Sequence, residues 1–346
     1  MRLLIVTQVV DTKDPVLGFF VRWIEEFAKR VEQIEVICLK EGVHELPANV
    51  HVHSLGKERG TRSRIAYTLR FLSLAWSLRH EYDAAFVHMN QEYVLIAGWF
   101  WKLLGKRIYM WRNHYAGSWL TNIAAVFCAK IFCTSQYSYT AKYKRTVRMP
   151  VGVDTERFSP DVRVMRTPHS ILFLGRISPS KRPEVLVNAL VLLVQEGVES
   201  VVSFFGSTLT QDEVFYEMLK EHVHALGLSD RVSFHLGVPN SQTPDLYRSH
   251  EIFVNASRSG MLDKTIFEAM ACGASILVSN KDLRERIDRE FIFTEGSSED
   301  LAQHLKHMLL LSEAERIAKN LPFATLVSEQ SLEKLGNMLI AELRVK

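Results

Sequence analysis

The sequence predicts an α/β protein made of two successive, doubly wound halves. Short apolar segments rich in β-branched residues alternate with helical patterns over residues 2–135, and the same alternation restarts at residue 171. Residues 148–170, between the two runs, hold three prolines and several charges, a composition typical of a linker. Buried strands that alternate with helices indicate parallel sheets built from βαβ units.

In the first half, apolar runs of strand length are separated by segments whose apolar residues recur at helical spacing. They predict strands at residues 2–8, 34–40, 84–90, 107–114 and 130–135, and helices at residues 17–31, 64–80, 92–105 and 119–129. We assign these elements to a first Rossmann-like domain, residues 1–150.

The second half repeats the pattern. It predicts strands at residues 171–176, 202–207, 232–237, 251–257 and 275–280, and helices at residues 183–197, 213–227, 243–249, 264–273 and 298–311. We assign residues 151–325 to a second Rossmann-like domain and residues 326–346 to a C-terminal helix that packs back toward the first. Ligands bind outside the carboxyl ends of strands in such sheets, so two facing domains predict a site in the cleft between them.

The composition is that of a soluble globular protein, with 47% hydrophobic and 23% charged residues. No segment approaches the roughly 18 uninterrupted apolar residues of a membrane span, and the N-terminus lacks a signal-peptide pattern. The four cysteines form no CxxC pair and lie in apolar contexts. They are expected to be buried free thiols, which favours a cytoplasmic location.

The charge is unevenly distributed along the chain. Residues 1–150 hold 21 Lys and Arg against 12 Asp and Glu, and the remainder holds 21 against 27. The basic excess gathers in residues 57–79, at Lys57, Arg59, Arg62, Arg64, Arg70 and Arg79. The helix in this segment carries a stripe of Ile65, Leu69, Leu72 and Trp76. The stripe fits packing against the core or weak peripheral contact with an anionic membrane, and nothing indicates a nucleic-acid partner.

Several residues with functional side chains follow predicted strands of the first half. Gly18 precedes a helix, where a glycine allows a ligand to approach the backbone, although a plain turn has the same need. His88 and Asn90 follow one strand, and His114 follows another. Histidine titrates near neutral pH and commonly acts in proton transfer, but it is also a common structural residue.

In the second half, Arg176 and Lys181 follow a strand and precede a helix that has Pro183 in its first turn. The helix dipole disfavours cations at this end, so their presence indicates a bound anion such as a diphosphate. Salt bridges with Glu184 are the structural alternative. Further on, Glu268 lies among apolar neighbours. A carboxylate is costly to bury there unless it is paired, and one that accepts bonds from two vicinal hydroxyls holds a ribose.

Three segments, “MPVGVDTERFSP”, “ILFLGRISPSKRP” and “FEAMACGASILVSN”, resemble the group 1 glycosyltransferases, also called family 4. Together they are specific, and the resemblance covers nearly the whole chain. It implies the GT-B fold, with two facing Rossmann-like domains and a cleft between them. It also implies that a sugar moves from a nucleotide-sugar donor to a glycan or lipid-linked acceptor with retention of configuration. No cofactor and no metal are implied, in agreement with the lack of an Asp-x-Asp signature.

The resemblance also implies a role for each matching residue. The donor diphosphate would be held by Arg176, Lys181 and Gly18, and the nucleotide ribose by Glu268. His114 would be the catalytic histidine, and His88 and Asn90 are candidates for the acceptor side. In the family a second glutamate stands eight positions before the one matched by Glu268, but here that position is Gly260.

Because Gly260 has no carboxylate, neighbouring residues would have to bind the donor sugar. Asp263 is one candidate, and the backbone amides of Met261, Leu262, Asp263, Lys264 and Thr265 are another. As a structural alternative, Asp263 and Lys264 form an exposed, helix-capping pair. The same departure motivates a catalytically silent nucleotide-sugar-binding relative as an alternative function. Fold alone does not separate a transferase from another GT-B enzyme such as a nucleotide-sugar epimerase. A dehydrogenase or a P-loop kinase lacks its glycine-rich fingerprint here.

Overall fold

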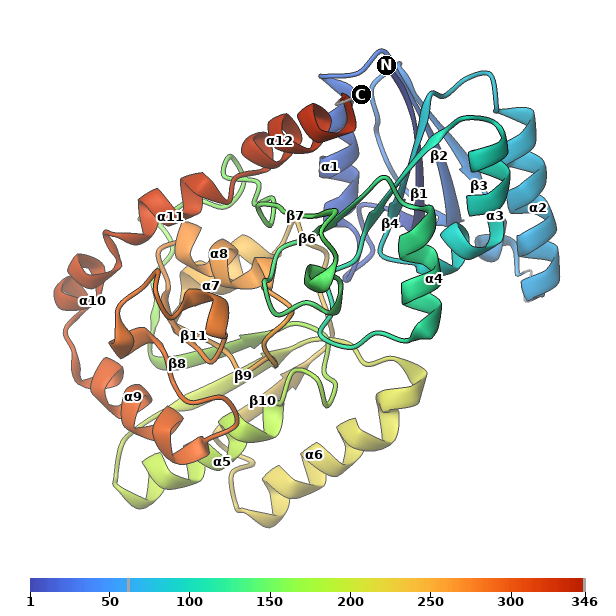
Figure 1. Cartoon of the computed structure of the whole chain (residues 1–346). Coiled ribbons are helices and arrows are strands. Elements are labelled where there is room, and N and C mark those ends of the chain that lie inside the picture. The colour runs from blue at the N-terminus through green and yellow to red at the C-terminus, as the bar shows by residue number, and fades with distance from the viewer. Residues whose placement is uncertain (61–62, 345–346) are drawn as a thin grey trace. The chain divides into compact units, whose positions relative to one another are not determined.

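The computed structural model describes residues 1–60 and 63–344 (Figure 1). The chain divides into two compact units, one formed by Met1–Gly152 with Leu332–Lys346 and the other by Val153–Ser331. The sequence places the change of domain at residue 150, and the structure changes unit after Gly152. The last helix, α12 (Leu332–Arg344), belongs to the first unit.

The first unit contains a seven-stranded sheet in the order β3-β2-β1-β4-β5-β6-β7. All its strand pairs are parallel. The strands are β1 (Arg2–Val10), β2 (Gln33–Glu41), β3 (Val50–Ser54), β4 (Ala84–His88), β5 (Arg107–Trp111), β6 (Lys130–Cys133) and β7 (Thr146–Arg148). The order reverses between β1 and β4, as in doubly wound sheets. The sequence did not predict β3 and β7, which are short edge strands with polar residues.

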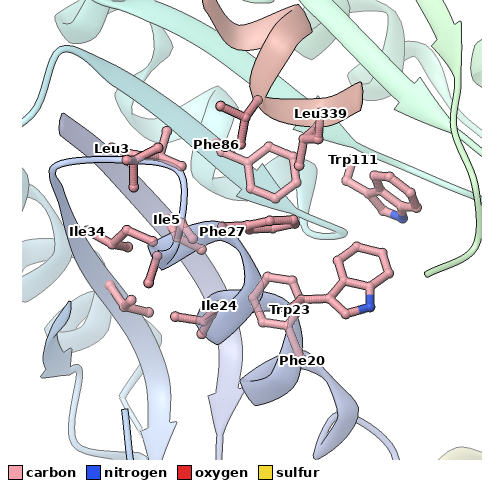
Figure 2. Close-up of a cluster of buried hydrophobic side chains, with 14 of the residues drawn as sticks. Leu3, Ile5, Phe20, Trp23, Ile24, Phe27, Ile34, Phe86, Trp111 and Leu339 are labelled. Carbon is pink, nitrogen blue, oxygen red and sulfur yellow. The ribbon is translucent and has the colours of Figure 1, made fainter. Parts of the chain in front are cut away.

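Helices cover both faces of this sheet: α1 (Phe19–Ala28) and α12 on one, and α2 (Arg64–Ser77), α3 (Gln91–Leu103) and α4 (Trp119–Phe127) on the other. Figure 2 shows the α1–α12 side, where Leu339 lies beside Phe86 and Trp111. The Tyr109 hydroxyl donates to the Leu343 carbonyl at 3.0 Å. Buried apolar packing and this hydrogen bond hold α12 on the first unit although it is distant in sequence.

Helix α2 buries a different face from the stripe of apolar residues in its sequence. Phe71 and Ala75 are fully buried, and the Phe71 ring lies 4.9 Å from that of Tyr93. Ile65 and Trp76 of the stripe are 74% and 53% exposed. Leu69 is 64% exposed as well, and only Leu72 of the stripe packs against the core, so most of the stripe does not pack there as the first alternative expects. The helix has apolar residues on two faces, and the face with the large Phe71 ring fills the space beside α3.

The second unit holds a five-stranded parallel sheet in the order β10-β9-β8-β11-β12. Its strands are β8 (Thr167–Leu174), β9 (Val201–Phe205), β10 (Val232–His235), β11 (His250–Asn255) and β12 (Ser275–Val278). Its helices are α5 (Pro183–Gln195), α6 (Glu213–Ala225), α7 (Thr243–Ser249), α8 (Lys264–Ala271), α9 (Ser298–Leu310), α10 (Glu313–Asn320) and α11 (Phe323–Glu329). Helix α5 packs on α9, and α8 packs on α7 and α11. The order reverses between β8 and β11, the position where doubly wound sheets bind ligands.

The two units agree with the α/β, doubly wound class that the sequence predicts. All four cysteines are buried, and none forms a disulfide within the described residues. Within residues 1–60 and 63–344, no helix combines the length and the apolar character needed to cross a bilayer.

Candidate active site

The loop that follows β8 carries the first predicted cation, Arg176. Gly175 has a φ of 148°, and a Cβ on Gly206 would lie 1.9 Å from the Gly175 carbonyl oxygen. Only glycine permits this close approach of the two loops. The Nε of Arg176 is buried and has no hydrogen-bond partner in the described part of the chain. A buried charged donor without an acceptor is energetically costly. This guanidinium is therefore suited to donate a hydrogen bond to an anionic oxygen.

Lys181, the second predicted cation, is paired with a carboxylate from another loop. Its Nζ donates to Asp263 Oδ2 at 2.6 Å. The alternative partner, Glu184, has a buried Oε2 without a hydrogen-bond partner in the described residues, and burial raises its pKa. The two cations therefore differ, since Lys181 already has an anionic neighbour and Arg176 Nε has no acceptor.

Asp263 lies at the N-cap of α8, but its side chain does not cap the helix. Its Oδ2 accepts hydrogen bonds from Asn255 at 3.0 Å and from Ser257 at 2.6 Å, besides the bond from Lys181. Burial alone would raise the pKa of Asp263, but Lys181 and these two donors outweigh it and lower the pKa. The structural alternative of an exposed capping pair is wrong, because the Asp263 side chain is 14% exposed and that of Lys264 is 16% exposed.

The loops after β8 and β11 are also joined through their backbones. The Arg258 amide donates to the Ser180 carbonyl at 3.2 Å. Glu295 Oε2 accepts from the Ser259 hydroxyl at 2.8 Å, and its Oε1 pairs with Arg182 at 3.2 Å. Because β8 and β11 are neighbours where the strand order reverses, these contacts assemble a polar site at the position typical of ligand binding.

Glu268 is 1% exposed, so its charge must be answered within the protein. Tyr247 donates to Oε2 at 3.1 Å, Asn240 donates to Oε1 at 3.3 Å, and Lys264 one turn earlier forms an ion pair with Oε1. Burial, with the Glu268 charge beside it, raises the pKa of Tyr247 well above its usual value. These three donors explain how a carboxylate is tolerated among apolar neighbours. A ligand hydroxyl that reached Glu268 would share the carboxylate with them or replace one of them.

In the first unit, the neighbouring backbone requires a glycine at position 18. Its φ is −56°, and an added Cβ would lie 2.5 Å from the Asp14 carbonyl and 3.0 Å from the Thr12 carbonyl. The loop before α1 thus folds against the position where a side chain would stand. This close contact accounts for the glycine without a ligand.

His88 is part of the interior at the end of β4. Its ring stacks on Phe20 with a centroid distance of 3.8 Å, and Nδ1 lies 3.2 Å from the Thr7 hydroxyl. The side chain is 2% exposed, and burial lowers its pKa to about 3. A buried, neutral imidazole is suited to packing rather than to proton transfer near neutral pH. Asn90 lies beyond it at the N-cap of α3, where it makes no side-chain cap bond.

His114 follows β5 and is partly exposed. The Ala116 amide lies 2.9 Å from its Nδ1, and its ring stacks on Tyr115 with a centroid distance of 4.5 Å. Nδ1 also lies 3.2 Å from the Ala116 carbonyl oxygen, so it faces both a donor and an acceptor of the same residue. The loop therefore positions the imidazole ring through its Nδ1 edge.

Comparison with known proteins identifies the second unit. Residues 154–321 match the sequence model of the family described as glycosyl transferases group 1. The second unit is a group 1 glycosyl transferase domain. Mannosylfructose-phosphate synthase of Agrobacterium fabrum is 30% identical over 41% of this chain and 34% of its own length. D-inositol 3-phosphate glycosyltransferase 2 of Catenulispora acidiphila is 31% identical over 41% of this chain and 36% of its own length. The chain thus matches about a third of these curated relatives.

Solved structures resemble the whole chain at low identity. HepE of Anabaena in complex with UDP-glucose has a TM-score of 0.80 and 16% identity, and covers 99% of both chains. Sucrose-phosphate synthase of Thermosynechococcus elongatus has a TM-score of 0.76, 14% identity, and covers 99% of this chain and 98% of its own. The GT-B fold class predicted from the sequence is confirmed by these likenesses.

Within this group 1 domain, Gly260 has a φ of +98°. Side chains with a Cβ are strained in this region. We expect Gly260→Ala to lower the free energy of unfolding by about 1–2 kcal/mol, because the cost arises at Cβ. Gly260→Glu should lower it by more, because residue 260 is buried and the variant must also accommodate a carboxylate there. Urea unfolding of both variants measures it. A glutamate variant as stable as the parent would contradict the strained conformation.

The group 1 domain also contains site residues that the sequence analysis missed. Tyr247 and Asn240 hold Glu268, Asn255 and Ser257 hold Asp263, and Glu295 joins two loops. Their partners are 6 to 113 positions away along the chain. No periodicity or local motif relates residues at such separations, so only the folded chain shows the pairs.

Proposed function

We propose that this protein is a retaining glycosyltransferase that moves a sugar from a nucleoside diphosphate sugar to a glycan or lipid-linked acceptor. The observation that carries the proposal is the joined pair of loops in the group 1 domain, where Arg176 has a buried, unsatisfied donor. HepE of Anabaena, which has the same fold, was solved in complex with UDP and glucose and in complex with UDP-glucose. In this protein, the positive charges of Arg176 and Lys181 in the loop after β8 suit the negative charge of a nucleoside diphosphate.

The proposed mechanism follows from where charge develops. Cleavage of the bond to the donor sugar places negative charge on the leaving diphosphate and positive character on the sugar. Arg176 and Lys181 stabilise the diphosphate, a preorganised electrostatic effect typically worth several kcal/mol. The chain supplies this charge from its own side chains, and we propose that neither a metal nor a cofactor is needed. His114 Nε2 donates to an oxygen of the reacting sugar or of the acceptor.

A donor screen tests the proposed function. The full chain is incubated with UDP-, GDP- and ADP-sugars and a panel of glycan and lipid-linked acceptors, and released nucleoside diphosphate is measured. We expect acceptor-dependent release with one donor class, and a product that keeps the anomeric configuration of the donor by NMR. An inverted product contradicts retention, and the lack of release with every pair contradicts the transferase.

The role of Glu268 as a ribose ligand is tested with a deoxy nucleotide. If Glu268 binds the ribose hydroxyls, Glu268→Gln weakens binding of the ribonucleoside diphosphate more than binding of its 2′-deoxy analogue. We expect roughly a tenfold loss for the first and a smaller loss for the second. Titration calorimetry with both nucleotides measures the difference. Equal losses would assign Glu268 to structure alone, through Tyr247 and Lys264.

One observation favours a second candidate function, binding of the nucleotide-sugar without transfer. Gly260 lacks the family's carboxylate, and Asp263, the nearest candidate to replace it, is already engaged by Lys181. Calorimetry that shows donor binding while the acceptor panel gives no turnover would support this alternative.

A further inference from the structure

The outward faces of α2, α3 and α4 form an apolar and basic surface on the first unit, here called the α2–α4 face. Nine large apolar side chains on it are exposed: Ile65, Leu69, Trp76, Trp99, Leu103, Trp119, Leu120, Ile123 and Val126. Each helix shows helical spacing, as in Ile65, Leu69 and Trp76 of α2 or Trp119, Ile123 and Val126 of α4. The three helices pack on the same side of the sheet (Figure 1). Their exposed stripes therefore lie on one layer.

Positive charge predominates in this region. The chain contains no Asp or Glu between Glu92 and Asp154, while this stretch holds nine Lys and Arg. Glu92 is the one acidic residue in the sequences of α2, α3 and α4. Arg64, Arg70 and Lys102 are exposed on the same helices, and the Arg79 guanidinium lies 4.2 Å from the centre of the Trp76 ring.

We propose that the α2–α4 face docks on a bilayer surface that contains anionic lipids. Three exposed tryptophans suit the boundary between headgroups and acyl chains, where this side chain is enriched. The exposed aliphatic residues would enter the apolar layer, and the cations would meet anionic headgroups. A second copy of the chain is a poorer occupant, because two such faces would bring like charges together.

This surface differs from the segment 57–79 for which the sequence predicts membrane contact. The apolar contribution comes from three helices, and α3 and α4 lie outside that segment. Of its cations, Arg62 lies outside the described residues. The inference rests on the first unit and is independent of the proposed donor site.

Vesicle sedimentation of the full chain tests the proposal. We expect binding to vesicles of phosphatidylcholine with phosphatidylserine, weakened by salt because surface charges are screened, and little binding to phosphatidylcholine alone. The variant Leu103→Glu with Val126→Glu, at positions 79% and 71% exposed, should lower the partition coefficient at least about a hundredfold, since it removes apolar contacts and adds repulsion. The matched control is Leu310→Glu with Leu321→Glu in the second unit, at positions 72% and 70% exposed. It should bind as the parent does.

Several outcomes would overturn the proposal. One is that the parent protein stays in the supernatant with the anionic vesicles at low salt. Another is a control pair that loses binding as fully as the α2–α4 pair. A third is that the protein does not bind vesicles but forms a concentration-dependent dimer, and that the Leu103 and Val126 substitutions dissociate this dimer. That result would assign the face to contact with a second copy of the chain. Circular dichroism of both double variants verifies that they fold, and nucleotide titration reports separately on the donor site.

Discussion

Replacing His114 with alanine is expected to lower turnover at least about a hundredfold, the low end for a positioned proton-transfer or hydrogen-bonding group. The reason is the geometry of the loop after β5. The Ala116 backbone positions the ring, with its amide nitrogen 2.9 Å and its carbonyl oxygen 3.2 Å from Nδ1. Alanine removes the imidazole and both of its ring nitrogens. Affinity for the nucleoside diphosphate should change little, because that ligand is proposed to bind residues of the second unit.

The matched variant His114→Gln separates a hydrogen-bond donor from a general base. A glutamine amide can donate but cannot accept a proton at neutral pH. If His114 acts as a donor, His114→Gln should retain more than about a tenth of the turnover, and if it acts as a base the variant should be as slow as alanine. His88→Ala is expected to act on stability, since its ring is stacked on Phe20 and buried. A fully active His114→Ala together with a folded, inactive His88→Ala would reverse the assignment.

The second large effect is expected at Arg176. Its Nε is buried without an acceptor, so a diphosphate oxygen would gain a charge-assisted hydrogen bond and relieve an unsatisfied donor. We expect Arg176→Ala to weaken UDP, GDP or ADP binding, whichever the protein prefers, by up to about a hundredfold, corresponding to roughly 1.5–3 kcal/mol. Lys181→Ala should weaken it less, about tenfold, because Asp263 already offsets the Lys181 charge at 2.6 Å.

Two further variants make this comparison interpretable. Arg182 is a neighbouring cation whose guanidinium pairs with Glu295, so Arg182→Ala controls for the general loss of a positive charge and should change affinity less than Arg176→Ala. Lys181→Ala leaves Asp263 buried without its cation, which is destabilising. Lys181→Ala with Asp263→Asn removes that charge and reports on binding in a folded protein. Unchanged nucleotide affinity in Arg176→Ala, with folding intact, would exclude the diphosphate role of this residue.

The sequence located the sheets of both units because buried parallel strands are continuous apolar runs that local patterns detect. It missed the edge strands β3 and β7. In β3 apolar and polar residues alternate, and β7 is only three residues long. It also left open which face of α2 is buried. Periodicity identifies a helix with apolar faces, but it does not show which face packs on the sheet. In the structure, the face that carries the large Phe71 ring is buried.

For the candidate site, the sequence by itself determined the residue types and their place after strands: Arg176 and Lys181 after one strand, and Glu268 in the helix after another. Tertiary structure alone decided their partners. Asp263 reaches Lys181 across 82 positions, and Tyr247 reaches Glu268 across 21. The physical reason is that a buried charge must be met by whichever polar group the fold brings within about 3 Å. Strand order sets this proximity, and it is not encoded in local spacing.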